Sequence, residues 1–406
     1  MIVLSEYKYE DEYRAMYRDS ELENIIIFRS GPMPENYIKY MDFDDNARAL
    51  FEYALTVGVN ESYKLVWIVK DPSEWEDDYR QYKNIFFVSY EDADSDDISK
   101  RDNYFRYICL AKYIFMTDTY GFALGSREDQ IRVMLWHGCG FKARLGNRRN
   151  ENNYEYMTVT GDEYANTYAK IFGLREDQML ITGYPKVDYI FKPTVNWNIK
   201  LNIPDAGRYI FWLPTFRNTA VSGMERHNQT RPEGEIGLPI VRTYEQLKML
   251  NAELINSDTV LVVKLHPFQD RALISDLSDF SNIRLIENDD LHSNNIHINQ
   301  ILGHADALIS DYSSVAVDYL VLDRPVAFTL DDVESYGIER GFFWPDVKPH
   351  LPGKELYSYE DFFEFILDVN SGKDPGAEKR RSICKDMQKY CDDKNSERVL
   401  RAVGII

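Results

Sequence analysis

The sequence predicts an α/β protein with two mainly parallel β-sheets, one in each half of the chain. Short apolar runs alternate with amphipathic helical stretches, which is typical of parallel strands connected by helices. The chain has 406 residues, which is too long for one ordinary α/β domain and suits two. A polar stretch over residues 196–207 separates the two series. We therefore expect one domain over residues 1–195 and a second over residues 196–406.

Each half supplies its own series of strands. The runs of the first half are 25–28, 64–69, 85–88, 113–116, 133–136, 156–160 and 179–183. Those of the second half are 209–213, 260–265, 283–286, 307–309 and 326–328. A helix is expected over residues 45–57, where apolar side chains recur at the spacing of one helix face, and a helical tail over residues 377–403.

Composition limits the partners and the compartment. Lys and Arg number 47 against 67 Asp and Glu, a formal charge of −20, which argues against nucleic acid and against general attraction to an anionic membrane. No apolar run approaches the ~18 residues of a spanning helix, and the start of the chain has no signal-peptide pattern. The four cysteines show neither zinc nor disulfide spacing, and Cys384 and Cys391 are expected on one helix face. These features predict a cytoplasmic protein. Peripheral contact with the inner face of the cell membrane is an alternative that would need a local patch, and the oligomeric state is left open.

A strand, a hydroxyl-rich turn and a helix follow one another in residues 305–325. Residues 307–309 are an apolar run, Ser313 and Ser314 lie in the turn, and residues 315–322 read as a helix that ends before Pro325. The free N–H groups at a helix start attract anions, and the two hydroxyls can add hydrogen bonds to a phosphate. The alternative is that a serine only caps the helix.

Two histidines also follow predicted strands. The run 133–136 leads into His137, which is followed by a flexible turn with Gly138 and Gly140. The run 260–265 ends beside Lys264 and is followed by His266. Ligands of α/β folds bind at the carboxyl ends of strands, so two histidines and a serine turn at such ends predict a shared site. Each histidine alone is more often structural.

These motifs resemble those of the CDP-glycerol glycerophosphotransferases, the family of teichoic acid primases and polymerases. The matching segments are Trp136 to Gly140, Gly183 to Lys186, Leu213 to Arg217, Lys264 with His266 and Pro267, Asp311 to Tyr319, and Asp45 to Arg48. The resemblance runs from about residue 25 to the C-terminal helix. The chain departs from the family pattern at Cys139, Gly140, Leu213 and Lys186.

The resemblance implies a GT-B-like fold, with two Rossmann-like domains facing a central cleft. It implies transfer of a polyol phosphate from a CDP-polyol, with CDP-glycerol the expected donor and CDP-ribitol an alternative. The acceptor would be a hydroxyl of a lipid-linked or polymeric cell-surface glycan, in the synthesis of teichoic acid-like or capsular polysaccharide, and CMP would be released. By resemblance His137 is the catalytic base and His266 assists at the phosphate. The implied donor-binding residues are Trp136, Gly138, Cys139, Gly140, Lys186, Pro214, Thr215, Lys264, Leu265, Ser313, Ser314 and Asp318.

A basic cluster follows the His-Gly turn in this acidic chain. Lys142, Arg144, Arg148 and Arg149 form it. We expect it to bind an anionic acceptor or a lipid pyrophosphate, the alternative being a solvated surface loop. No metal-ligand spacing is present, so no cofactor is assigned, although a requirement for a divalent metal is left open.

Two other functions remain to be separated from this one. A GT-B glycosyltransferase that uses a nucleotide sugar could have the same fold, and a non-catalytic relative could bind a nucleotide or glycan. The chain contains neither GxGxxG nor GxxxxGK[ST], which argues against nicotinamide cofactors and a Walker-type ATPase.

Overall fold

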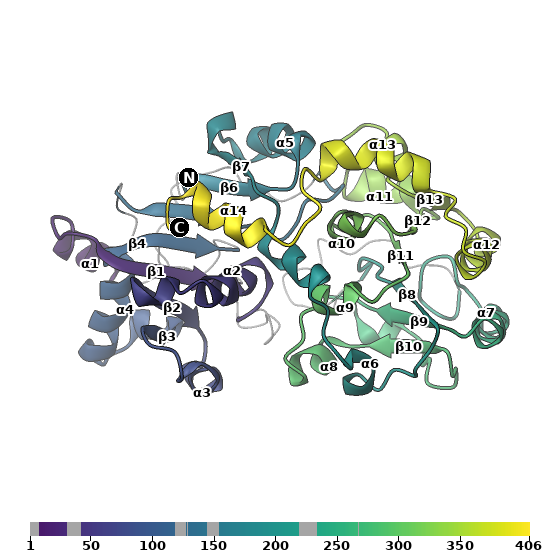
Figure 1. Cartoon of the computed structure of the whole chain (residues 1–406), viewed down its shortest axis with the longest axis horizontal. Coiled ribbons are helices and arrows are strands. Elements are labelled where there is room, and N and C mark those ends of the chain that lie inside the picture. Colours follow the sequence, from purple (N-terminus) through teal and green to yellow (C-terminus); the bar gives the residue numbers. More distant parts are fainter. Residues whose placement is uncertain are drawn as a thin grey trace.

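The computed structural model describes residues 8–30, 42–117, 127, 129–143, 154–218, 234–266 and 268–406. Within these ranges the chain forms two sheets, which lie at opposite ends of the long axis (Figure 1). All strand pairs within both sheets are parallel. The predicted α/β class with two parallel sheets is therefore confirmed.

The first sheet has the strand order β3-β2-β1-β4-β5-β6-β7. Its strands are β1 (Glu23–Arg29), β2 (Lys64–Val69), β3 (Ile85–Ser89), β4 (Ala111–Met116), β5 (Ile131–Met134), β6 (Tyr156–Val159) and β7 (Met179–Ile181). The second has the order β10-β9-β8-β11-β12-β13. Its strands are β8 (Arg208–Trp212), β9 (Thr259–Lys264), β10 (Ile283–Ile286), β11 (Ala307–Ser310), β12 (Val326–Thr329) and β13 (Lys354–Leu356). Every strand expected from the sequence is present, and β13 is an additional edge strand.

Helices connect and cover the strands. The α-helices are α1 (Glu10–Met16), α2 (Asp45–Thr56), α3 (Glu76–Tyr79), α4 (Ile98–Leu110), α5 (Asp162–Phe172), α6 (Trp197–Lys200), α7 (Tyr244–Asn256), α8 (Asn288–Ser293), α9 (Asn299–Leu302), α10 (Val315–Tyr319), α11 (Val333–Glu339), α12 (Tyr359–Asn370), α13 (Ala377–Met387) and α14 (Asn395–Ala402). The short 3-10 helices are η1 (Val59–Glu61), η2 (Pro72–Glu74), η3 (Tyr90–Asp94), η4 (Glu176–Gln178), η5 (Pro185–Phe191), η7 (Arg271–Leu273), η8 (Leu320–Leu322) and η9 (Lys348–His350). No helix within the described ranges combines the length and apolar character needed to cross a bilayer.

The described residues form three apolar cores, one of which contains side chains of both sheets. One core lies on a face of the second sheet, where Trp212 packs against Phe362 of α12 with ring centroids 4.9 Å apart. Another lies under α2 and α14 on the first sheet. A third core contains side chains of both sheets, such as Ile114 of β4 and Leu308 of β11. The halves are thus packed against each other, and this contact fixes which strand ends face one another.

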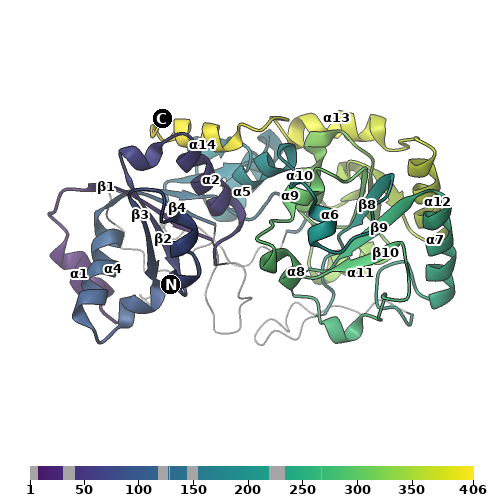
Figure 2. The same ribbon diagram turned by 60° about the horizontal axis from the view of Figure 1, so that its bottom comes forward.

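The C-terminal tail forms two helices where the sequence predicted one. Helix α13 ends because Gln388 is extended, and α14 starts at Asn395. Helix α13 packs on α5, and α14 packs on α2 and η5, so the tail runs back along both halves (Figure 2). The carboxylate of Asp188 accepts hydrogen bonds from the backbone N–H groups of Asn395 and Ser396, both at 2.9 Å, and holds the start of α14. The domain limits 1–195 and 196–406 stay a prediction.

The same break separates two cysteines that were expected to share one helix face. Cys384 lies on α13, whereas Cys391 follows the end of that helix and is exposed. The expectation that the two cysteines share one helix face is therefore wrong, because the helix does not continue to residue 391.

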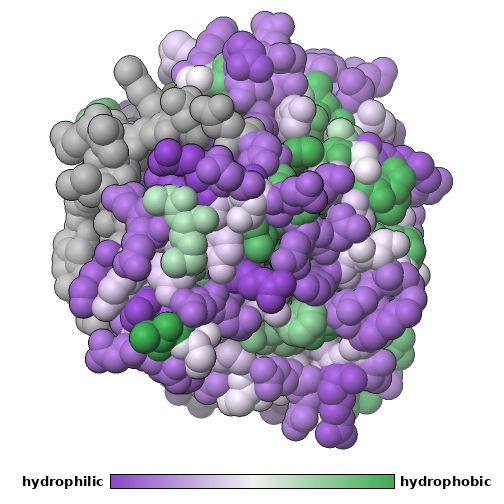
Figure 3. Space-filling model, turned by 90° about the vertical axis from the view of Figure 1, so that its left-hand side faces the viewer, coloured by the Kyte–Doolittle hydropathy of each residue, from purple (hydrophilic) through white to green (hydrophobic). Residues whose placement is uncertain are grey.

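The surface of the first half is mainly polar. Figure 3 shows hydrophilic residues over most of the described part of the face at that end of the molecule, with single apolar residues between them. This distribution agrees with the formal charge of −20. Isolated apolar side chains on a protein surface are ordinary and indicate no binding face.

The loop after β5 contacts the second half directly. The backbone N–H of Phe343 donates to the carbonyl of Phe141 at 3.1 Å, and Lys142 forms an isolated antiparallel bridge with Phe342. Gly138 has a φ of 148°, and a Cβ atom there would lie 2.6 Å from the Ser314 hydroxyl oxygen. A side chain at Gly138 therefore cannot fit without moving the two halves or the Ser314 turn.

We expect Gly138→Ala to destabilise the protein more than the same substitution at a glycine that has open space around it. Gly173 is a matched control, because its φ is 68° and nothing lies within 4 Å of the added Cβ. The control loses only the left-handed backbone preference, about 1–2 kcal/mol, whereas Gly138→Ala adds the overlap with Ser314. The melting temperatures of the two variants should differ by several degrees in differential scanning calorimetry. Equal melting temperatures would show that the two halves can move apart at residue 138 without a loss of stability.

Candidate active site

A cavity of about 270 Å³ lies between the halves, where the carboxyl ends of β8, β9, β10 and β11 meet. Successive connections run in opposite directions from β8, so this edge is the switch point of the second sheet, where open α/β sheets bind ligands. The predicted site residues that line the cavity are Lys186, Pro214, Lys264, Leu265, His266, Ser313, Ser314 and Asp318. The first half contributes Asp44, Asp45 and Arg48 from the start of α2.

The serine turn lies on the wall of this cavity. Ser313 and Ser314 are half-buried and precede α10. The predicted helix over residues 315–322 is α-helical only over Val315–Tyr319 and continues as the 3-10 helix η8. The Ser313 hydroxyl accepts a long hydrogen bond of 3.5 Å from the Val315 backbone N–H, and Ser314 at the N-cap of α10 makes no side-chain capping bond. A hydroxyl that accepts from the backbone can still donate its own hydrogen to a ligand.

Asp311 anchors the adjoining turn after β8. It is fully buried, and its Oδ2 accepts from the Thr215 N–H and hydroxyl, both at 2.8 Å, and from Arg217 at 3.0 Å. Arg217 also pairs with Asp332 at 2.5 Å. The Thr215 hydroxyl therefore bonds inside the protein, although the residue borders a small cavity next to Pro214 and His266. The sequence did not predict this anchoring role, although the matching segment Asp311 to Tyr319 begins at Asp311.

His266 is a neutral hydrogen-bond donor at the cavity. Burial, together with the positive charges of Lys142, Lys264 and Arg340, holds the pKa of His266 well below its usual range. Its Nδ1 accepts from the Phe268 backbone N–H at 3.1 Å, so the ring proton is on Nε2. Lys264 donates to Asn288 at 2.8 Å, and burial lowers the pKa of Lys264 to about 8. The cavity wall that contains Lys264 and His266 thus offers hydrogen-bond donors and positive charge.

The carboxylate of Asp45 lies beside the ring of His137, and both residues belong to the first half. His137 Nδ1 lies 3.4 Å from Asp45 Oδ2, and 31% of the His137 side chain is exposed. Lys186 and His137 outweigh the effect of burial and hold the pKa of Asp45 well below its usual range, so this carboxylate is charged. His137 does not itself line the cavity, but Asp45 does. An ionised carboxylate beside Nδ1 favours the tautomer that carries its proton on Nδ1, in which Nε2 is the basic nitrogen.

Lys186 and Asn46 fix the loop that carries His137. Lys186 Nζ donates to the His137 carbonyl and lies 3.2 Å from Asp45 Oδ1 and 3.6 Å from Asp318 Oδ2. The two carboxylates outweigh burial and raise the pKa of Lys186. The Asn46 amide donates to the Trp136 carbonyl at 2.7 Å and accepts from the Lys186 N–H at 3.1 Å. The sequence motif at residues 45–48 was visible, but these contacts were not predicted.

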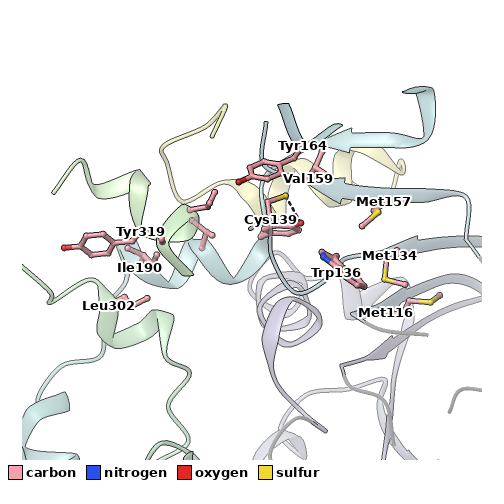
Figure 4. Close-up of a cluster of buried hydrophobic side chains, with 14 of the residues drawn as sticks. Met116, Met134, Trp136, Cys139, Met157, Val159, Tyr164, Ile190, Leu302 and Tyr319 are labelled. Carbon is pink, nitrogen blue, oxygen red and sulfur yellow. Dashed lines mark hydrogen bonds between the residues drawn. The ribbon is translucent and has the colours of Figure 1, made fainter. Parts of the chain in front are cut away.

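Two of the residues implied by the resemblance lie behind this loop and outside the cavity lining. Trp136 is buried at a φ of 58° and packs edge-on against Phe172. Cys139 is fully buried, its Sγ lies 3.1 Å from the Tyr184 hydroxyl, and burial raises its pKa to about 12. Figure 4 shows both side chains within the apolar core. They support the loop from the core side.

The basic cluster is only partly described. Lys142 is partly buried next to the loop of Arg340, and burial lowers the pKa of Lys142 to about 7. Arg144, Arg148 and Arg149 lie outside the described residues. In the part of the chain with known placement, no three His, Cys, Asp or Glu side chains are arranged to hold a metal ion, so no residue is assigned to one.

Comparison with known proteins places this geometry in a family. The teichoic acid glycerol-phosphate primase of Bacillus subtilis is 25% identical over 418 residues, covering 94% of this chain and 95% of the primase. The teichoic acid ribitol-phosphate polymerase TarL of Staphylococcus aureus is 26% identical over 311 residues, covering 72% of this chain and 51% of TarL. The chain thus spans about half the length of TarL.

The fold has a close counterpart among solved structures. The wall teichoic acid polymerase TagF superimposes with a TM-score of 0.70 over 97% of this chain and 92% of the TagF chain, at 20% identity. This confirms the predicted GT-B-like fold. Residues 26–404 match the model of the CDP-glycerol:poly(glycerophosphate) glycerophosphotransferases, and the chain belongs to that family.

Proposed function

We propose that this chain transfers a polyol phosphate from a CDP-polyol, with CDP-glycerol as the expected donor, to a hydroxyl of a lipid-linked or polymeric cell-surface glycan. CMP is released, and the product belongs to a teichoic acid-like or capsular polysaccharide. The observation that carries the proposal is the cavity between the halves, which faces Lys264, His266 and the serine turn on one side and Asp45 beside His137 on the other. If the acceptor is lipid-linked, the reaction takes place at the inner face of the membrane.

In this proposal the acceptor hydroxyl gives its proton to Nε2 of His137, and its oxygen attacks the β-phosphorus of the donor. The bond between that phosphorus and the bridging oxygen breaks, and its electron pair leaves with CMP. Asp45 orients the His137 ring and stabilises the imidazolium that forms. Lys264, the Nε2–H of His266 and the hydroxyls of Ser313 and Ser314 stabilise the negative charge on the phosphates. Lys186 holds together the two halves of the chain that carry these residues.

The donor is tested first, by release of CMP. We expect CMP release from CDP-glycerol or CDP-ribitol in the presence of a lipid-linked glycan acceptor, and none of the corresponding products from UDP- or GDP-sugars. CDP should raise the melting temperature more than UDP or ADP, because a ligand that binds the native state stabilises it. Ser313→Ala with Ser314→Ala should reduce that rise, whereas Ser335→Ala, outside the cavity lining, should not. Transfer from a nucleotide sugar would make the chain a glycosyltransferase, and binding without turnover would make it a non-catalytic relative.

Substitution of the two histidines should affect catalysis and donor binding differently. His137→Ala is expected to bind CDP nearly normally and to lose kcat by at least about 100-fold, the usual contribution of a positioned base. His266→Ala should weaken CDP binding as well as turnover, because its ring faces the donor wall. His350→Ala, which stacks on Trp344 and does not line the cavity, is the control and should keep both. Steady-state kinetics and calorimetric CDP titration separate the effects; loss of CDP affinity with unchanged kcat in His137→Ala would assign His137 to the donor.

For the acceptor, we propose that Arg144, Arg148 and Arg149 attract an anionic glycan or lipid pyrophosphate, with Lys142 next to them in the sequence. Charge reversal to Glu at the three arginines should raise the acceptor KM and leave CDP affinity unchanged. The increase should be largest at low ionic strength, since salt screens exposed charges. The measurement is acceptor KM at two salt concentrations, and an unchanged KM at low salt would count the arginines as solvated surface.

A further inference from the structure

A group of polar side chains in the cavity has no part in the steps above. Asp44 precedes α2 in the first half, and His297 and Asn299 lie at the start of α9 in the second half. Asp318 lies on α10, and all four residues line the cavity. His297, Asn299 and Asp318 are each less than one-tenth exposed. Buried polar groups without partners cost free energy, so their arrangement requires an explanation.

Asp44 and His297 face each other across the two halves. His297 Nε2 lies 3.8 Å from Asp44 Oδ1, which is too far for a hydrogen bond. The backbone N–H of Asn299 donates to His297 Nδ1 at 3.0 Å, so the neutral ring carries its proton on Nε2, on the side of Asp44. Burial lowers the pKa of His297 and favours this neutral form. Asp44 Oδ1 has no hydrogen-bond partner among the described residues.

Asn299 and Asp318 present a second donor and a second acceptor. Each is 1% exposed. Asn299 Nδ2 and Asp318 Oδ1 form no hydrogen bond of normal geometry with any described group. Burial raises the pKa of Asp318, and the neighbouring Lys186 and Asn299 offset part of that effect. The other oxygen of Asp318 is 3.6 Å from Lys186 Nζ. The free atoms therefore comprise two carboxylate acceptors, an amide donor and an imidazole donor.

This set of atoms matches hydroxyl groups better than phosphate. A hydroxyl both donates and accepts, so it can bridge Asp44 and His297 or satisfy Asn299 and Asp318. Carboxylates repel phosphate oxygens, whereas Lys264 and His266 attract them. Resting on the proposed donor, we propose that Asp44, His297, Asn299 and Asp318 bind the hydroxyl groups of the polyol that the CDP-polyol carries. The pyrophosphate then lies along the serine turn and Lys264.

The test compares two probes of equal charge. CDP-glycerol carries two free hydroxyls on its alcohol, and the ethyl ester of CDP carries none. The wild type should bind CDP-glycerol about tenfold more tightly than the ethyl ester in calorimetric titration, as expected for one or two net hydrogen bonds. Asp44→Asn and Asn299→Ala should each reduce this preference several-fold and leave the affinity for the ethyl ester unchanged. Asp44→Asn keeps the shape of the side chain, which guards against loss of folding.

Asp42→Asn is the matched control, because it makes the same change two residues away and does not line the cavity. It should keep the wild-type preference. A wild type without any preference, or variants that retain it, would overturn the polyol subsite while the donor proposal stands. Variants that weaken both probes equally would overturn it in favour of a structural role, and a raised acceptor KM with an unchanged preference would move the cluster to the acceptor. Failure of the wild type to bind either probe would instead overturn the donor itself.

Discussion

A buried lysine between carboxylates of different origin holds the site together. Lys186 follows β7, Asp45 begins α2, and Asp318 belongs to α10 of the other half. Removing one partner of such a buried pair leaves an uncompensated charge and typically costs about 3–5 kcal/mol. Because Lys186 also donates to the His137 carbonyl, the pair that joins the halves also fixes the histidine loop. The position of His137 relative to the serine turn is therefore a property of the interface between the halves.

Parallel sheets explain why residues far apart in sequence meet here. Successive parallel strands present their carboxyl ends at one edge, so the segments after β8, β9, β10 and β11 converge although they span about a hundred residues of sequence. The first half approaches this edge with the glycine loop after β5. Only glycine at residue 138 allows the backbone to lie against Ser314, where a Cβ would be 2.6 Å from the hydroxyl oxygen. Chain topology supplies the edge, and Gly138 allows the close contact.

The sequence was sufficient for the strands and for the residues at their ends. Strands buried on both faces read as continuous apolar runs, which is why β1, β2 and β9 were found nearly to the residue. Strand β13 was missed because Lys354–Leu356 is short and polar at the sheet edge. The single tail helix was predicted because periodicity does not reveal the extended Gln388 that ends α13.

The contacts between the site residues could not be predicted from sequence patterns. Asp45 and His137 are 92 residues apart, and Asp311 and Arg217 are 94 residues apart. Nothing local indicates either pair, because each depends on how two separate segments are placed. The same limit applies to Thr215 and Cys139, whose motif match suggested donor contact. Their polar atoms contact Asp311 and Tyr184, and these contacts become visible only when the neighbouring elements are in place, while the donor role of the two residues stays a prediction.

An acidic protein can bind an anionic donor because charge acts mainly at short range. A formal charge of −20 repels a nucleotide diphosphate from a distance, but at physiological salt that repulsion is screened beyond about 8 Å. At the cavity wall, His266 is buried and lies within the electrostatic reach of Lys264, Lys142 and Arg340. The carboxylates there are not spread evenly either: Asp45 and Asp318 are offset by Lys186, whereas Asp44 faces an uncharged His297. The cavity therefore has a wall suited to phosphate and a wall suited to hydroxyl groups, and a CDP-polyol is a ligand that contains both.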